Sequence, residues 1–185
     1  MKRINLFLIW IVIIPVLLGS CGSTKSWRKS EKQTEIKMPF TGRAYKSDKN
    51  FFRAVQLGSS IDLSTAKKIA MQNAKVDLAS GIQSTVKAVT EQYISQRDVN
   101  YKKEFENRFE EISRLVTNQV LSNVRVIDEK LFKAKNGEFT YHIAIEVKKD
   151  DVLTDIEKKV SNMQLEFDQA QFRKLFDEEM SKLEK

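Results

Sequence analysis

The chain has 185 residues, of which 41% are hydrophobic and 31% charged, and its formal net charge is +7. This composition allows one modest hydrophobic core, and the single cysteine excludes an internal disulfide bond and a paired-cysteine metal site. A basic surplus can indicate nucleic-acid binding. An exported protein, however, meets little nucleic acid, so for the export predicted below we expect anionic lipid headgroups or cell-wall polymers as neighbours and no nucleic-acid partner.

The N-terminus has the layout of a secretory signal peptide. Lys2 and Arg3 precede an apolar run from Ile4 to Leu18. A membrane-spanning helix needs about 20 apolar residues, so this run is short for a retained span. We therefore predict that residues 1–20 are removed, which reduces the net charge of +7 by the two basic residues.

The end of the apolar run, Leu18-Gly19-Ser20-Cys21, resembles the lipobox of bacterial lipoproteins. In a lipobox, two small residues precede the cysteine that receives a diacylglyceryl group. The resemblance implies cleavage between Ser20 and Cys21 and lipidation of Cys21, with membrane lipid as the partner of its acyl chains. One acyl chain anchors a protein marginally, whereas two or three hold it firmly. We expect a membrane-bound protein that has no spanning helix.

Residues 21–49 are predicted to be the lipidated cysteine and a flexible basic tether. Basic residues outnumber acidic ones here, and the sequence shows neither helical nor strand periodicity. A random coil of this length spans about 30 Å. Each basic side chain close to an anionic leaflet contributes up to about 1 kcal/mol. A merely solvated tether is the alternative interpretation.

A small α+β domain is predicted for residues 50–150. Phe51–Leu57 is typical of a short strand, closed by a turn at Gly58–Ser60. Asp62 stands where a helix N-cap is expected. A long helix follows, with one face at three- and four-residue spacing: Ala66, Ile69, Ala70, Asn73, Ala74, Leu78, Ile82, Val86 and Val89. The small alanines predict a close approach to a sheet.

A second helix is predicted from a similar pattern after residue 100. Its apolar positions are Tyr101, Phe105, Phe109, Ile112, Val116 and Val120. Glu110 and Glu111 are adjacent carboxylates, but neighbours in a helix point about 100° apart. They therefore do not converge on one substrate atom, and we expect them to be solvated.

An antiparallel β-hairpin is predicted from Val124–Lys135 and Glu138–Lys148. These runs are joined by Asn136-Gly137, which favours a two-residue loop with positive φ at both positions. In that register the core face carries Phe139, Tyr141, Ile143, Ile145 and Val147 with Ala134, Phe132, Val126 and Val124. Lys130 and Asp128 fall on the same face, so either a bulge shifts the first strand or its centre is an exposed edge.

The C-terminal residues 151–185 are predicted to form an amphipathic helix. Three-four spacing is typical both of a self-association seam and of a helix packed on its own domain. Both alternatives are kept for the same face: Leu153, Ile156, Val160 and Met163. The first alternative predicts a homo-oligomer. A phase shift near Gln171 indicates a break, or two faces that contact different surfaces.

No catalytic constellation is recognisable, and we predict that the chain is not an enzyme. His142, the sole histidine, is expected on the outward face of its strand beside Thr140 and Ala144. It has no second histidine or free cysteine for a metal site or a nucleophile. No glycine motif for binding phosphate is present. We therefore expect no catalytic residue, no metal ligand and no cofactor.

Three segments together with the lipobox resemble the LPP-twenty lipoprotein family, and in particular its Bacteroidota members. They are the strand Phe51–Ala54, the helix Thr65–Ala79 and the hairpin stretch Gly137–Tyr141. The resemblance implies an outer-membrane lipoprotein with a small α+β domain and no known enzymatic activity. It implies no catalytic or ligand residue in this chain.

The residues after Cys21 bear on which way the domain faces. Surface-exported lipoproteins of the Bacteroidota resemble one another in an acid-rich stretch at this place, whereas Gly22–Lys29 has no acidic residue. We therefore expect an outer-membrane protein facing the periplasm, with a non-catalytic structural or protein-interaction role and an envelope-protein or cell-wall partner. A periplasmic binding module for a soluble ligand or cell-wall fragment is the alternative.

Overall fold

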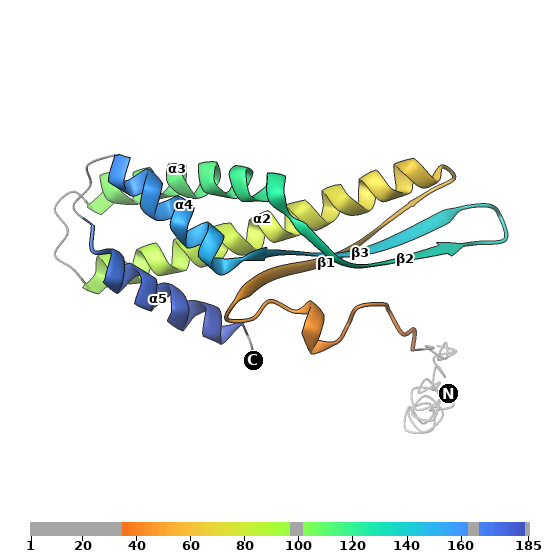
Figure 1. Cartoon of the computed structure of the whole chain (residues 1–185), viewed down its shortest axis with the longest axis horizontal. Coiled ribbons are helices and arrows are strands. Elements are labelled where there is room, and N and C mark those ends of the chain that lie inside the picture. The colour runs from red at the N-terminus through yellow and green to blue at the C-terminus, as the bar shows by residue number, and fades with distance from the viewer. Residues whose placement is uncertain (1–34, 97–101, 163–166, 184–185) are drawn as a thin grey trace, which may run out of the picture. The chain divides into compact units, whose positions relative to one another are not determined.

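The computed structural model describes residues 35–96, 102–162 and 167–183 (Figure 1). The predictions for residues 1–20, for Ser20 and for Cys21 lie outside these residues. Two short 3-10 helices, three strands and four α-helices occur in the described part, in this order: η2 (Arg43–Tyr45), β1 (Phe51–Ser60), α2 (Leu63–Gln96), α3 (Lys102–Val120), η3 (Leu121–Asn123), β2 (Arg125–Lys133), β3 (Phe139–Lys148), α4 (Lys149–Asn162) and α5 (Gln169–Lys182). The predicted α+β class is confirmed.

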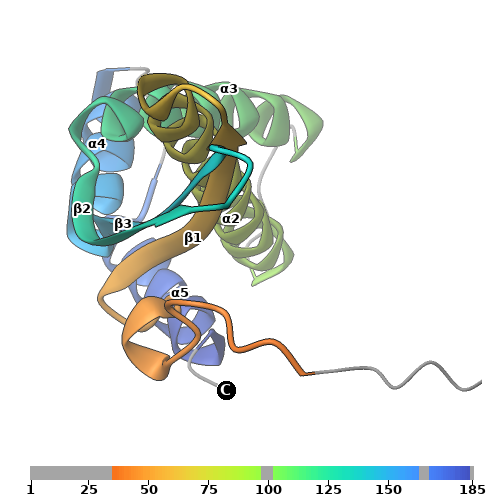
Figure 2. The same cartoon turned by 90° about the vertical axis from the view of Figure 1, so that its right-hand side faces the viewer.

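The three strands form one antiparallel sheet in the order β1-β3-β2. The central strand β3 pairs Ile145 with Ala54 on one side and with Val126 on the other. Helix α2 runs along one face of this sheet (Figures 1 and 2). We call the opposite face, which carries Arg53, Arg125 and Glu146, the outer face.

Strand β1 is longer than the sequence predicted, and the turn expected at Gly58–Ser60 is wrong. These residues continue the strand, and Gly58 pairs with Tyr141 of β3. Gly58 serves helix packing instead of a turn. A Cβ at Gly58 would lie 2.4 Å from the carbonyl oxygen of Ala66, so only glycine lets α2 come this close to the strand.

Helix α2 begins as predicted, because the Asp62 carboxylate accepts a hydrogen bond from the Thr65 N–H at 2.7 Å. The predicted alanine ridge is confirmed: Ala66, Ala70 and Ala74 are fully buried. Two residues that were predicted on the buried face are exposed instead, Ile69 and Asn73. Asn73 lies beside β1, where its side-chain amide donates to the Leu57 carbonyl at 3.1 Å.

The hairpin forms, but its predicted two-residue loop is wrong. The Gly137 N–H donates to the Ala134 carbonyl at 3.0 Å, and the Ala134 N–H donates to the Glu138 carbonyl at 2.8 Å. Gly137 has a φ of 91°, whereas Asn136 does not have a positive φ. The loop therefore has three residues and ends in a glycine bulge.

The extra loop residue shifts the register of β2 by one position. Phe132 now pairs with Thr140 and lies beside His142 on the outer face, away from the core face predicted for it. Leu131 takes the place opposite Tyr141. The shift at the loop by itself places Asp128 and Lys130 on the outer face. Both predicted alternatives are found: a bulge lies between Val126 and Asp128 and returns Val126 to the core face, and β2 is an edge strand that is largely exposed.

The C-terminal residues form two helices, so the prediction of one continuous helix is wrong, whereas the break indicated by the phase shift near Gln171 is confirmed. The break falls before Gln169, and Asp168 caps α5 by accepting a hydrogen bond from the Gln171 N–H at 3.0 Å. The buried apolar residues of the two helices all belong to the same core as the sheet and α2: Val152, Leu153, Ile156, Val160, Phe172, Leu175, Phe176 and Met180. Phe176 meets Phe52 of β1 edge to face, with ring centroids 6.2 Å apart.

The structure favours the intramolecular alternative for the candidate self-association face. Leu153 and Ile156 are 0% exposed and Val160 is 2% exposed, all within their own chain. Met163 lies outside the described residues. Because these three side chains are already buried within the chain, they could form an interface with a second copy only if α4 left the core.

Candidate functional site

Part of the predicted tether is packed on the outer face of the sheet. Phe40 is buried, and the Lys130 ammonium lies 5.4 Å from the centroid of its ring. The Tyr45 hydroxyl donates to the Asp128 carboxylate of β2 at 2.7 Å. Residues 37–49 are therefore not a free spacer: the tether joins the folded part before β1 begins.

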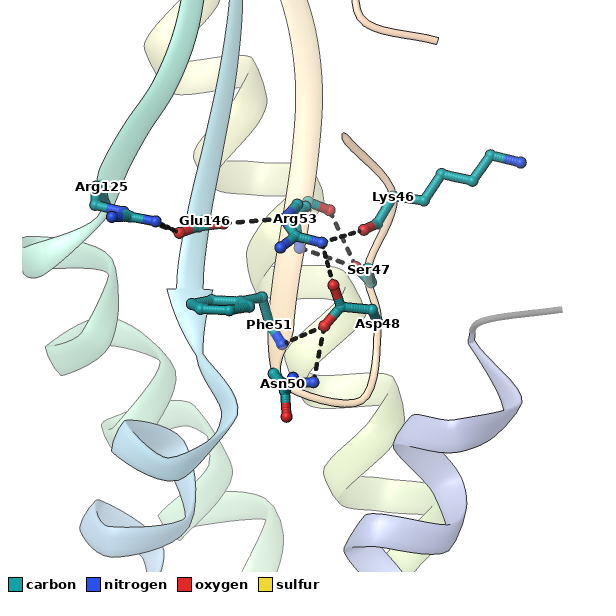
Figure 3. Close-up of polar contacts among 8 residues, drawn as sticks. All are labelled: Lys46, Ser47, Asp48, Asn50, Phe51, Arg53, Arg125 and Glu146. Atoms are coloured by element: carbon teal, nitrogen blue, oxygen red, sulfur yellow. Dashed lines mark hydrogen bonds and ion pairs between the residues drawn. The ribbon is translucent and has the colours of Figure 1, made fainter. Parts of the chain in front are cut away.

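A buried carboxylate lies at the centre of the outer face. Glu146 of β3 is 3% exposed and lies between Arg53 of β1 and Arg125 of β2, its neighbours in the register (Figure 3). Arg53 Nε donates to Glu146 Oε2 at 2.9 Å, and Arg125 Nε donates to Oε1 at 2.9 Å. Ionic hydrogen bonds thus connect all three strands at one level of the sheet.

Arg53 also holds the segment that precedes β1. Its Nη1 donates to the Lys46 carbonyl at 2.8 Å and pairs with the Asp48 carboxylate at 2.5 Å (Figure 3). The Ser47 hydroxyl accepts from the Arg53 N–H at 2.9 Å and donates to the Arg53 carbonyl at 3.2 Å. We call these six residues the Arg53 network: Lys46, Ser47, Asp48, Arg53, Arg125 and Glu146.

The turn into β1 is closed by Asp48. Its Oδ1 accepts from the Asn50 N–H at 2.8 Å and from the Phe51 N–H at 3.0 Å. Burial raises the pKa of Asp48, but the hydrogen bonds from Asn50, Arg53 and Phe51 outweigh it, and the pKa lies below 3.8. Burial lowers the pKa of Arg53, whereas Asp48 and Glu146 raise it more. Asp48 and Arg53 thus each hold the other in its charged form.

This arrangement fastens chain segments together. Arg53 contacts two carboxylates and a carbonyl at once, and bidentate or multiple guanidinium contacts fix geometry as well as charge. Arg125 is 69% exposed on its side chain, so its bond to Glu146 is partly screened by solvent. The buried Arg53–Glu146 pair is the stronger element of the network.

The sequence did not reveal the Arg53 network. The sequence pattern places Lys46, Ser47 and Asp48 in the tether and predicts no partner for Arg53 or Glu146. The one available signal was the position of Arg53 and Glu146 on the polar side of two alternating strands. To recognise that Arg53 and Glu146 form an ion pair, one must know that β1 pairs with β3, and these strands are distant in sequence.

His142 lies on the outer face, as predicted, and is 9% exposed. Burial lowers its pKa below 6.5, so the neutral imidazole is favoured. Its ring meets Phe132 edge to face at a centroid distance of 5.4 Å. Among the described residues, no group of three or more histidine, cysteine, aspartate or glutamate side chains is arranged to hold a metal ion.

A groove of about 620 Å³ lies between α2 and α3. Its walls carry Lys87 and Glu91 from α2 and Glu106 and Arg114 from α3. Ser113 also lines the groove, is 6% exposed, and has no hydrogen-bond partner for its Oγ among the described residues. Buried hydroxyls are usually satisfied, so the Ser113 hydroxyl is available to a polar ligand in this groove.

Within the described part of the chain, no helix combines the length and apolar character needed to cross a membrane.

Comparison with models of protein families gave no match, and comparison with curated proteins gave none either. The resemblance to the LPP-twenty lipoprotein family therefore remains a prediction from the residues quoted for it.

Proposed function

We propose that this chain is an outer-membrane lipoprotein, anchored through Cys21, with a non-catalytic structural or protein-interaction role in the cell envelope. The observation that carries the proposal is the attachment of Lys46, Ser47 and Asp48 to the sheet through Arg53 and Glu146. In a lipid-anchored domain, any mechanical force on the anchor reaches the fold through the first residues of its folded part. The Arg53 network shares this force among three strands instead of leaving it to β1 alone.

The lipid anchor is tested by Cys21→Ala in the native host. We expect the variant to keep its signal peptide and to lack acyl chains, because the thiol is the acceptor. Metabolic labelling with a fatty acid and the shift in mass on processing measure this. Ser23→Ala is the matched control and should be processed normally. Normal processing and labelling of Cys21→Ala would contradict the anchor.

The periplasmic orientation has its own test. A protease added to intact cells should leave the domain uncut until the outer membrane is opened, because a periplasmic domain is shielded by that membrane. Digestion on intact cells would place the domain at the surface. Exposed lysines on α3 and α5 provide cleavage sites, among them Lys102, Lys103 and Lys174.

A binding module for a soluble ligand or cell-wall fragment is the second candidate function, and the groove between α2 and α3 favours it. The unpartnered Oγ of Ser113 and the charges of Lys87, Glu91, Glu106 and Arg114 would suit a polar ligand that carries both signs of charge. Soluble peptidoglycan fragments should then raise the melting temperature of the protein, since a ligand that binds the folded state stabilises it. Arg114→Ala should reduce that rise.

A further inference from the structure

The basic surplus of the described chain is concentrated on one face. The segment Lys37–Asn50 carries four basic residues against one acidic residue, a net charge of +3. Helices α2, α3, α4 and α5 together carry fourteen basic and thirteen acidic residues, a net charge of +1. Since the segment Lys37–Asn50 lies on the outer face, the positive charge gathers on the side of the sheet away from α2.

The strands add further positive charge to this face, while its acidic groups are engaged. Arg125 and Lys148 are exposed and lie at outer-face positions of the register, opposite Glu146 and Phe51 respectively. Glu146 and Asp48 belong to the Arg53 network, and Asp128 accepts the Tyr45 hydroxyl. Asp128 keeps its negative charge, but basic residues outnumber acidic ones on this face. Its acidic residues are Asp48, Asp128 and Glu146, and its basic residues are Arg53, Arg125, Lys130 and Lys148 of the strands and the four of the segment Lys37–Asn50. The field in front of the outer face is therefore positive.

Apolar side chains are exposed among these charges. Met38 is 55% exposed next to Lys37, and Phe132 is 50% exposed on the outer face of β2. Basic residues mixed with exposed apolar ones are typical of surfaces that bind lipid at the headgroup boundary. A cell-wall polymer would attract the charges but would give the apolar side chains no favourable contact.

We propose that the outer face docks on an anionic phospholipid surface, that of the bilayer in which the chain is anchored. The inference rests on the proposed anchor at Cys21, because the chain between Cys21 and Lys37 reaches at most about 55 Å when fully extended. The anchor thus keeps the face within reach of the leaflet. Electrostatic attraction to anionic headgroups then orients the domain, with Arg43 and Lys46 among the contacting residues.

The test uses the full lipidated protein reconstituted into vesicles, with Met38→Cys labelled by an environment-sensitive fluorophore. With about a third phosphatidylglycerol in the bilayer, we expect emission at shorter wavelength than in pure phosphatidylcholine, because anionic lipid draws the basic face in. High salt should remove this difference, since it screens the attraction. Flotation of the protein with both kinds of vesicle shows whether the acyl chains anchor it, independently of whether the outer face docks.

Charge reversal provides the matched variants. In the labelled protein, Arg43→Glu with Lys46→Glu should abolish the difference in emission, whereas Lys102→Glu with Lys103→Glu on α3 makes the same charge change and should preserve it. Identical emission in the two vesicle types, or equal loss in both double variants, would overturn the docking proposal. If the emission did not differ between the vesicle types but the protein bound purified peptidoglycan, the outer face would instead be a surface that binds the cell wall. Failure to float would count against the lipid anchor itself.

Discussion

Gly58 of β1 lies directly against the backbone of Ala66 on α2. A Cβ at Gly58 would be 2.4 Å from the Ala66 carbonyl oxygen and 2.5 Å from the Ala70 nitrogen, both backbone atoms. We therefore expect Gly58→Ala to push α2 away from the sheet and to lower the free energy of unfolding by about 1–3 kcal/mol, as overpacking does. Chemical denaturation measures the change.

The control for this prediction is Gly81, which lies in α2 and has no atom within 4 Å of an added Cβ. Gly81→Ala should raise the free energy of unfolding by about 0.5–1 kcal/mol, because alanine is the better helix former. If both substitutions changed stability in the same direction, the close approach at Gly58 would not be the cause.

Glu146→Gln tests the Arg53 network. The substitution keeps the shape of the side chain but leaves Arg53, which is 11% exposed on its side chain, without its most buried partner. Removing one member of a buried ion pair typically costs about 3–5 kcal/mol. Arg53 retains Asp48, so we expect a loss of about 3 kcal/mol, at the lower end of that range, in the free energy of unfolding.

Glu104→Gln is the matched control for Glu146→Gln. Glu104 pairs with Arg108 at 3.0 Å, but the two side chains are 60% and 43% exposed. Exposed pairs of this kind contribute only about 0.3–0.5 kcal/mol, so the control should be nearly neutral. Equal losses from the two substitutions would show that burial does not distinguish Glu146.

His142 predicts a defined pH dependence of stability. Burial lowers its pKa in the folded protein, whereas the unfolded chain has the ordinary value of about 6.5. Below pH 6.5 the unfolded state therefore binds the proton more readily, and the free energy of unfolding falls until the pH passes the folded pKa. Above pH 6.5, His142 does not contribute to the change of the free energy of unfolding with pH.

Two measurements check this prediction. His142 is the sole histidine in the chain, so one imidazole resonance in the NMR spectrum reports its folded pKa directly, and we expect it below 6.5. His142→Gln should flatten the fall in stability between about pH 6.5 and the folded pKa. A folded pKa at or above 6.5 would contradict the burial of the neutral ring.

The α+β class, the alanine ridge, the cap at Asp62 and the apolar face of α3 followed from local patterns. Each depends on residues close together in the chain, which periodicity and capping preferences describe well. The wrong prediction at Gly58 concerns a contact distant in sequence. The sequence favours a turn at Gly58 because nothing in β1 itself reveals that α2 packs against this residue.

The Arg53 network shows the same limit, whereas the hairpin loop is a local ambiguity. Asn136-Gly137 fits both a two-residue loop and a three-residue loop with a glycine bulge, and the choice shifts the side chains from Asp128 to Lys133 to the other face. The pairing of Arg53 with Glu146 depends on that of β1 with β3, whose partners lie about 90 residues apart in the chain. No local signal specifies either arrangement.

The last prediction decides between the two roles of the C-terminal face. Leu153 is 0% exposed, so Leu153→Ala should leave a cavity and lower the free energy of unfolding by about 2–5 kcal/mol. The oligomeric mass in light scattering should stay the same, because Leu153 packs within its own chain. Leu115→Ala, at a position 43% exposed on α3, is the control and should cost far less. A fall in oligomeric mass on Leu153→Ala, with the melting temperature unchanged, would instead require that α4 leaves the core to form a self-association seam.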